Sequence, residues 1–184
     1  MENNFKNVLR NIFDFLKTLV FSLLLVVFIR FFIISPFSVK GKSMEPSFYE
    51  GEYLIVDEIS YRFKDFKRGD VIVLKYKDKQ GISEFLIKRI VGLPGEEVII
   101  SNGKVLIKNE ENPDGYYLEE DYLSENIETF GNIKELVSED NYFILGDNRP
   151  NSLDSRYFGS ILKDQIVGRV FFRGFPFDRF TLFN

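Results

Sequence analysis

The chain has 184 residues and a net charge of −4, and it contains neither histidine nor cysteine. The missing cysteines exclude disulfides, thiol nucleophiles and cysteine-ligated metals, and the missing histidines exclude a Ser-His-Asp triad. The length fits one domain with an anchor, the 21 phenylalanines exclude a disordered chain, and the acidic balance gives no overall attraction to nucleic acid.

Residues 12–34, after a short tail at 1–11, form a long apolar segment that reads IFDFLKTLVFSLLLVVFIRFFII. An apolar helix of about 20 residues crosses the hydrocarbon of a bilayer, and Lys17 and Arg30 lie near the ends, where long side chains reach the headgroups. We therefore predict a transmembrane helix at 12–34. A cleaved signal peptide and a buried core helix are the alternatives, although the chain has no alanine for a typical cleavage site.

Short β-rich runs follow Ser35-Pro36, where proline ends the helix because it has no N–H and restricts the residue before it. Asn102-Gly103 lies between two apolar runs and predicts a two-residue hairpin turn. With no convincing second long helix, these runs predict an all-β body over residues 35–184, built as a barrel or sandwich. The predicted strands cover residues 52–57, 70–76, 84–91, 97–100, 104–108, 142–145 and 166–173.

Residues 110–140 differ from the rest of this body. They are acidic, contain few apolar runs and include the turn cluster Asn112-Pro113-Asp114-Gly115. We interpret them as an acidic surface excursion with no chemistry of its own.

Ser43 is the first candidate for chemistry. It lies in Gly41-Lys42-Ser43-Met44-Glu45-Pro46-Ser47, nine residues after the apolar segment. A serine hydroxyl is a weak nucleophile that needs a base within hydrogen-bond reach, and without histidine that base is a lysine or a carboxylate. Taken alone, a serine beside a glycine is also typical of an ordinary turn.

Lys88 is the best candidate for the base. A lysine can serve only if burial lowers its pKa from ~10.4 toward neutrality. Strand alternation puts Lys88 on the same face as Leu86 and Ile90 and puts Arg89 on the other face. Lys75 is a weaker rival because other lysines follow it closely, which favours a solvated strand end.

The stretch Gly146–Arg156 forms a third cluster, directly after the predicted strand at 142–145. It is dense in turn formers and charges, which by themselves build tight loops with local hydrogen bonds. Ser152 offers a hydroxyl that could orient a neutral lysine amine. Asp154 and Arg156 supply alternating charges that could pair with Arg89.

These stretches, in this order, resemble the motifs of type I bacterial signal peptidases, the membrane-bound serine proteases of peptidase family S26. The four matching stretches are Gly41–Ser47, Arg68–Val73, Lys88–Gly95 and Gly146–Arg156. The resemblance covers nearly the whole chain from the apolar segment onward. It implies the signal-peptidase fold, Ser43 as nucleophile, Lys88 as general base and an acyl-enzyme intermediate.

The resemblance also implies supporting roles. Ser152 would hydrogen-bond the Lys88 amine and hold it in place. Some relatives carry a second serine for the oxyanion where this chain has Gly41, so the backbone N–H of Ser43 is the expected donor. A charge network that shapes the loop would consist of Asp147, Asp154, Arg156 and Arg89.

The family cleaves after small residues at the −1 and −3 positions, which implies small pockets that exclude large side chains. By alignment, the residues expected to line them are Phe37, Val39, Leu86 and Ile87. The resemblance further implies a single-pass protein of the bacterial cytoplasmic membrane, with its N-terminus inside and its catalytic body on the outer face.

The expected partners are preprotein signal peptides and the lipid bilayer, without nucleic acid, metal or cofactor, and we expect a monomer. The Phe-rich end at residues 171–180 either packs into the core or inserts into the lipid surface. Two other functions compete with signal-peptide removal. One is a self-cleaving Ser/Lys peptidase of the SOS-repressor kind, and the other is a membrane-tethered β module without activity.

Overall fold

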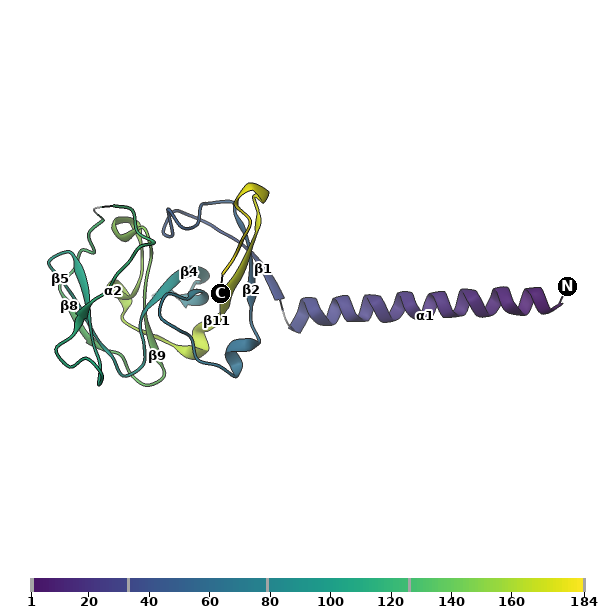
Figure 1. The fold of residues 1–184 in the computed structure, drawn as a ribbon, viewed down its shortest axis with the longest axis horizontal. Coiled ribbons are helices and arrows are strands. Elements are labelled where there is room, and N and C mark those ends of the chain that lie inside the picture. The colour runs from purple at the N-terminus through teal and green to yellow at the C-terminus, as the bar shows by residue number, and fades with distance from the viewer. Residues whose placement is uncertain (1, 33, 79, 126, 184) are drawn as a thin grey trace.

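One long helix projects from a β body in the structure, a computed structural model that describes residues 2–32, 34–78, 80–125 and 127–183 (Figure 1). The helix, α1 (Glu2–Phe32), begins ten residues before the predicted start, because the polar residues ahead of the apolar segment continue the same helix. Among the described residues, no helix combines the length and the apolar character that crossing a membrane requires. The prediction of a helix is therefore confirmed, whereas the predicted membrane span at 12–34 is not supported.

Two antiparallel sheets make up the body, so the predicted mostly-β architecture is confirmed and every predicted strand is present. The larger sheet follows the order β1-β2-β11-β3-β4-β9-β10, with β12 paired to β11, and the smaller sheet follows β7-β6-β5-β8. The strands of the larger sheet are β1 (Ile34–Ser38), β2 (Tyr53–Asp57), β3 (Val71–Lys77), β4 (Ser83–Gly92), β9 (Asn141–Leu145), β10 (Ile161–Leu162), β11 (Ile166–Phe175) and β12 (Thr181–Leu182). Those of the smaller sheet are β5 (Glu97–Ser101), β6 (Lys104–Lys108), β7 (Tyr116–Tyr117) and β8 (Ile133–Leu136).

Among the described residues, five strands were not predicted, namely β1, β7, β8, β10 and β12, and two of them were missed for clear physical reasons. β1 contains Pro36, which a central strand would reject, but β1 lies at the edge of the sheet, where a missing N–H is tolerated. β8 lies inside the acidic stretch at 110–140 and pairs with β5, with Leu136 opposite Glu97. The stretch is therefore partly built into the smaller sheet.

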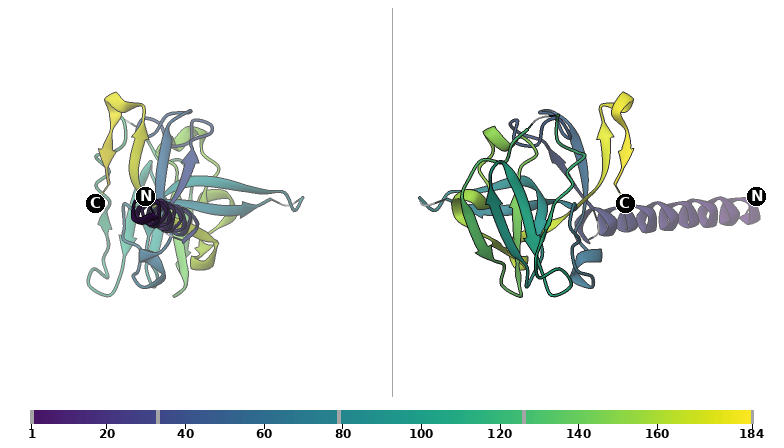
Figure 2. Two further views of the ribbon diagram at one scale, coloured as in Figure 1. Left: turned by 90° about the vertical axis from the view of Figure 1, so that its right-hand side faces the viewer. Right: turned by 60° about the vertical axis from the view of Figure 1, so that its left-hand side comes forward.

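The predicted hairpin turn at Asn102-Gly103 joins β5 to β6. Both residues have positive φ, 51° at Asn102 and 76° at Gly103, as a tight turn between twisted strands requires. Ser101 pairs with Lys104 on either side of the turn. A larger hairpin, made of β3 and the first half of β4, extends beyond the body as an arm (Figure 2).

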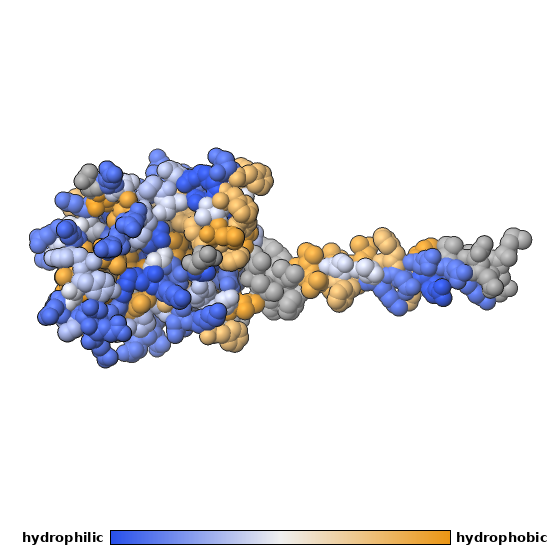
Figure 3. All heavy atoms as spheres, viewed as in Figure 1, coloured by the Kyte–Doolittle hydropathy of each residue, from blue (hydrophilic) through white to orange (hydrophobic). Residues whose placement is uncertain are grey.

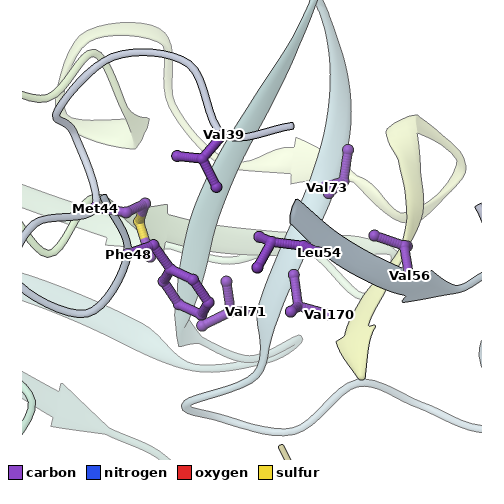
Figure 4. Packing of buried hydrophobic residues seen from close by; sticks show 8 residues of the cluster. All are labelled: Val39, Met44, Phe48, Leu54, Val56, Val71, Val73 and Val170. Atoms are coloured by element: carbon purple, nitrogen blue, oxygen red, sulfur yellow. The ribbon is translucent and has the colours of Figure 1, made fainter. Parts of the chain in front are cut away.

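Figure 4 shows the part of the core that lies beneath the N-terminal loop. Met44 and Phe48 come from the loop between β1 and β2, and they pack on residues of β2, β3 and β11. Both side chains are buried, and fully burying one such side chain stabilises the fold by roughly 1.5–3 kcal/mol. Because Met44 is anchored in this way, the residue before it, Ser43, is held at the surface of the core.

Candidate active site

Ser43 and Lys88 meet although they are far apart in the sequence. Ser43 comes from the loop between β1 and β2, and Lys88 comes from β4. Lys88 Nζ donates a hydrogen bond to Ser43 Oγ over 2.8 Å and another to the carbonyl oxygen of Ile87 over 2.9 Å. Over the first of these contacts, a neutral amine could take the serine proton.

The position of Lys88 changes its acid–base chemistry. Only 2% of the residue is exposed, as the strand alternation predicts. Burial disfavours the charged form and lowers the pKa of Lys88 from 10.5 to about 8, against the opposing pull of Asp154, Asp147 and Glu84. A substantial neutral fraction is therefore present near neutral pH, which an exposed lysine would not have.

Asn148 anchors the loop that carries Ser43 through two hydrogen bonds. Its backbone N–H donates to the carbonyl oxygen of Ser43 over 3.0 Å, and its side-chain amide donates to the carbonyl oxygen of Lys42 over 3.0 Å. The sequence analysis did not single out Asn148, because an asparagine in a loop gives no signal of a partner more than 100 residues away. Gly41 has φ of +75°, a left-handed conformation that glycine adopts without strain.

The predicted charge network consists of two separate pairs. Arg89 donates to Asp147 through Nε over 2.9 Å and through Nη2 over 2.6 Å. Arg156 binds Asp154 in the same bidentate manner, through Nε over 2.8 Å and through Nη2 over 2.9 Å. The suggested pairing of Arg89 with Asp154 or Arg156 is absent from the contacts of the described residues, because Asp147 occupies the guanidinium.

Asp154 and Ser152 support the loop from inside. Asp154 Oδ2 accepts a hydrogen bond from the backbone N–H of Gly146 over 3.0 Å. Ser152 is 6% exposed, and its Oγ has no hydrogen-bond partner among the described residues. The expected hydrogen bond from Ser152 to Lys88 is therefore not formed, and the carbonyl oxygen of Ile87 holds the amine instead.

A cleft of about 560 Å³ opens beside the Ser43–Lys88 pair. The residues proposed by alignment to line the substrate pockets all contribute to its wall, namely Phe37, Val39, Leu86 and Ile87. Phe37 from β1 packs edge-on against Phe85 from β4, with ring centroids 5.4 Å apart. A larger hollow of about 660 Å³ lies elsewhere, beside Tyr61 and Phe66, and neither member of the pair lines it.

Most of the acidic stretch at 110–140 is exposed, but two of its residues pack against the charge network around Asp147. The Tyr122 ring lies 3.9 Å from the guanidinium of Arg89, and Glu120 pairs with the buried Arg149. These residues could not be found from the sequence, because their partners lie in β4 and in the loop after β9.

Comparisons with known proteins agree with the motifs. The family model described as signal peptidase, peptidase S26 matches residues 12–175. A probable signal peptidase I-2 from Synechocystis sp. is 37% identical over 170 residues, covering 90% of this chain and 74% of that protein. Signal peptidase I P from Bacillus subtilis subsp. natto is 36% identical over 181 residues, covering 92% of each chain. The crystal structure of a signal peptidase I from Enterococcus faecalis V583 has 31% identity and a TM-score of 0.46, covering 58% of this chain and 97% of that one.

Proposed function

We propose a mechanism of signal-peptide removal for this chain, which belongs to the signal peptidase family (peptidase S26). In this mechanism Ser43 is the nucleophile and Lys88 is the general base. Membership of the family makes the protein a serine endopeptidase. The observation that carries the proposed mechanism is the 2.8 Å contact between Lys88 Nζ and Ser43 Oγ in a chain without histidine. A buried lysine with a lowered pKa supplies the base that a chain without histidine needs.

The reaction proceeds in two steps. Neutral Lys88 takes the proton of Ser43 Oγ as this oxygen attacks the scissile carbonyl carbon, and the backbone N–H of Ser43 faces the developing oxyanion. The ammonium of Lys88 then gives its proton to the leaving amine, and an ester remains on Ser43. In the second step Lys88 deprotonates a water, the water attacks the ester, and Ser43 is released with its proton restored.

The cleft suits a substrate with small side chains next to the cut. Phe37, Val39, Leu86 and Ile87 fill much of its wall with apolar bulk, so sterics favour small residues at the −1 and −3 positions. Both reacting groups belong to one chain, which suits a monomeric enzyme.

Cleavage of a preprotein, with the cut site mapped by mass spectrometry, tests the function. The purified full chain in detergent should cut a preprotein after a small residue at −1, and a preprotein with phenylalanine at −1 should be cut at least about 100-fold more slowly, because the pocket excludes its ring. The Ser43→Ala variant serves as the control for contaminating proteases. Cutting at sites unrelated to the signal peptide, or equal cutting of both preproteins, would contradict the proposal.

The rate should rise with pH to a plateau above pH 8. Only neutral Lys88 can accept the serine proton, and its pKa is about 8. The logarithm of kcat/KM should therefore climb with pH below the pKa and level off above it. A profile from about pH 6 to pH 10 with a peptide substrate measures the midpoint. A midpoint at the ordinary lysine value of 10.5 would mean that Lys88 does not serve as a desolvated base.

The outer face of the bacterial cytoplasmic membrane is the proposed place of action. Hydrophobic side chains gather on the side of the body next to α1 (Figure 3). Figure 2 shows the C-terminal hairpin of β11 and β12 on that side. In this hairpin Phe177 is 81% exposed and Phe180 is 60% exposed, so these two rings do not pack into the core. Aromatic rings that are exposed in this way favour contact with a lipid surface, where substrate preproteins also lie.

A further inference from the structure

The segment that contains Glu120 and Tyr122 contacts two arginines close to the proposed active site, Arg89 and Arg149. It lies in the connection between β7 and β8, in the smaller sheet's part of the chain. Its two side chains reach β4 and the loop at residues 146–156, which carries Asp147, Ser152 and Asp154. We call the pair Glu120 and Tyr122 the latch.

Tyr122 covers the ion pair that follows Lys88 on β4. The guanidinium of Arg89 donates two hydrogen bonds to Asp147. The centroid of the Tyr122 ring lies 3.9 Å from the central carbon of this guanidinium. A ring at this distance attracts the cation and shields the ion pair from water. The Tyr122 hydroxyl donates to Glu120 Oε1 over 2.5 Å, so the ring is fixed in this position.

Glu120 holds the other side of the same loop. It forms a bidentate pair with Arg149, which is 1% exposed, including a hydrogen bond of 2.9 Å between Arg149 Nη1 and Glu120 Oε2. Arg149 Nε donates to the carbonyl oxygen of Gly146 over 3.1 Å. Breaking a buried ion pair from one side leaves an uncompensated charge, which disturbs a structure far more than losing a surface pair does.

We propose that Glu120 and Tyr122 are positioning residues that hold Arg89, Asp147 and the loop at 146–156 in place beside the strand that carries Lys88. This inference rests on the proposed function, because it assigns the latch a role in setting up Lys88 as the base. The observation that carries it is the continuous chain of contacts from Glu120 through Tyr122 to Arg89, the neighbour of Lys88 on β4, and from Arg89 to Asp147 in the loop.

The latch also affects the charge around Lys88. The charged groups that act on its amine are Asp154 and Asp147 from the loop and Glu84 from β4, all of which favour the protonated form. Replacement of Glu120 by glutamine would leave the positive charge of Arg149 without its partner, and this charge also acts on Asp147. This added positive potential disfavours protonated Lys88, so the rising limb of the pH profile should move to lower pH.

The test compares Glu120→Gln with Glu119→Gln in the full chain. The first removes a buried charge at constant size, and the second removes an exposed charge one residue away. We expect Glu120→Gln to lower kcat about tenfold through misplacement of the base while KM stays within about twofold. We also expect the midpoint of the pH profile to fall by about half a unit. Glu119→Gln should match the wild type in every respect.

Tyr122 provides a second variant pair in case Glu120→Gln does not fold, as judged by circular dichroism. Tyr122→Leu should lower kcat at unchanged KM. Tyr122→Phe, which keeps the ring over Arg89, should retain more than about half of the wild-type kcat. Variants that lose only thermal stability, with kcat and midpoint equal to the wild type, overturn the inference. A wild type that does not cut preproteins overturns the proposed function instead, so the two failures are distinguishable.

Discussion

Replacement of Lys88 by methionine should abolish cleavage and, at the same time, make the folded protein more stable. The variant loses the amine that contacts Ser43 Oγ and serves as the proposed base, so kcat should fall at least about 1000-fold. Methionine has a similar length and no charge. It therefore fills the same buried space and removes the cost of keeping an ammonium there.

The stability gain depends on pH in a defined direction. The pKa of Lys88 is 10.5 in its ordinary state and about 8 in the fold, so between these values the unfolded chain binds more protons than the folded one. Wild-type stability should therefore rise by about 3 kcal/mol as the pH increases from 8 to 10.5, while the stability of Lys88→Met lacks this increase. The advantage of the variant is complete below pH 8 and disappears near pH 10.5.

Urea unfolding at about pH 7 and pH 10, together with cleavage assays, measures both effects. Lys75→Met is the matched control, because Lys75 lies on the neighbouring strand β3 with its side chain exposed. It should keep wild-type activity and wild-type pH dependence of stability. Residual cleavage above about 1% in Lys88→Met, or a stability change without pH dependence, would contradict the assignment of Lys88 as a buried base.

Gly146→Ala should nearly abolish cleavage, although it adds only one methyl group that takes no part in the reaction. A Cβ at this position would lie 2.1 Å from Ser152 Oγ and 2.5 Å from the carbonyl oxygen of Ser43. The second atom belongs to the backbone, so the nucleophile loop itself must move. A shift of about 1 Å at a reacting group costs roughly 100-fold in rate, and the overpacking also destabilises the fold by about 1–3 kcal/mol.

Gly174→Ala provides the comparison for this steric effect. Gly174 lies in β11, and its added Cβ would approach only the Phe172 ring, at 3.3 Å, which can adjust. Measurement of kcat and Tm for both variants should show a large loss of activity in Gly146→Ala and a small change in Gly174→Ala. Equal activities would mean that the close approach of the two loops at Gly146 has no bearing on Ser43.

Local sequence patterns were sufficient wherever the determining contacts are local. The alternation in β4 correctly predicted that Lys88 faces inward and that Arg89 faces the opposite side, because side chains of a strand alternate whatever lies around it. The turn at Asn102-Gly103 followed from the ease with which both residues adopt positive φ.

Contacts between distant segments could not be read in the same way. The partner of Arg89 is Asp147, 58 residues away, and its ring neighbour Tyr122 lies in a stretch that looks like solvated loop. The hydrogen bond expected from Ser152 is missing, and the amine of Lys88 instead donates to the carbonyl oxygen of its own neighbour, Ile87. Neither arrangement has a signature in residue spacing, since both depend on how the sheets pack.

The burial of Lys88 also determines where the catalytic proton can travel. Its amine contacts Ser43 Oγ and the carbonyl oxygen of Ile87, and almost none of the residue is open to solvent. In the proposed mechanism, the proton taken from Ser43 rests on an amine that is almost closed to solvent while a peptide fills the adjoining cleft. Lys88 would then deliver this same proton to the departing amine, so the first step needs no proton from the surrounding buffer, and water has to enter only for the second step.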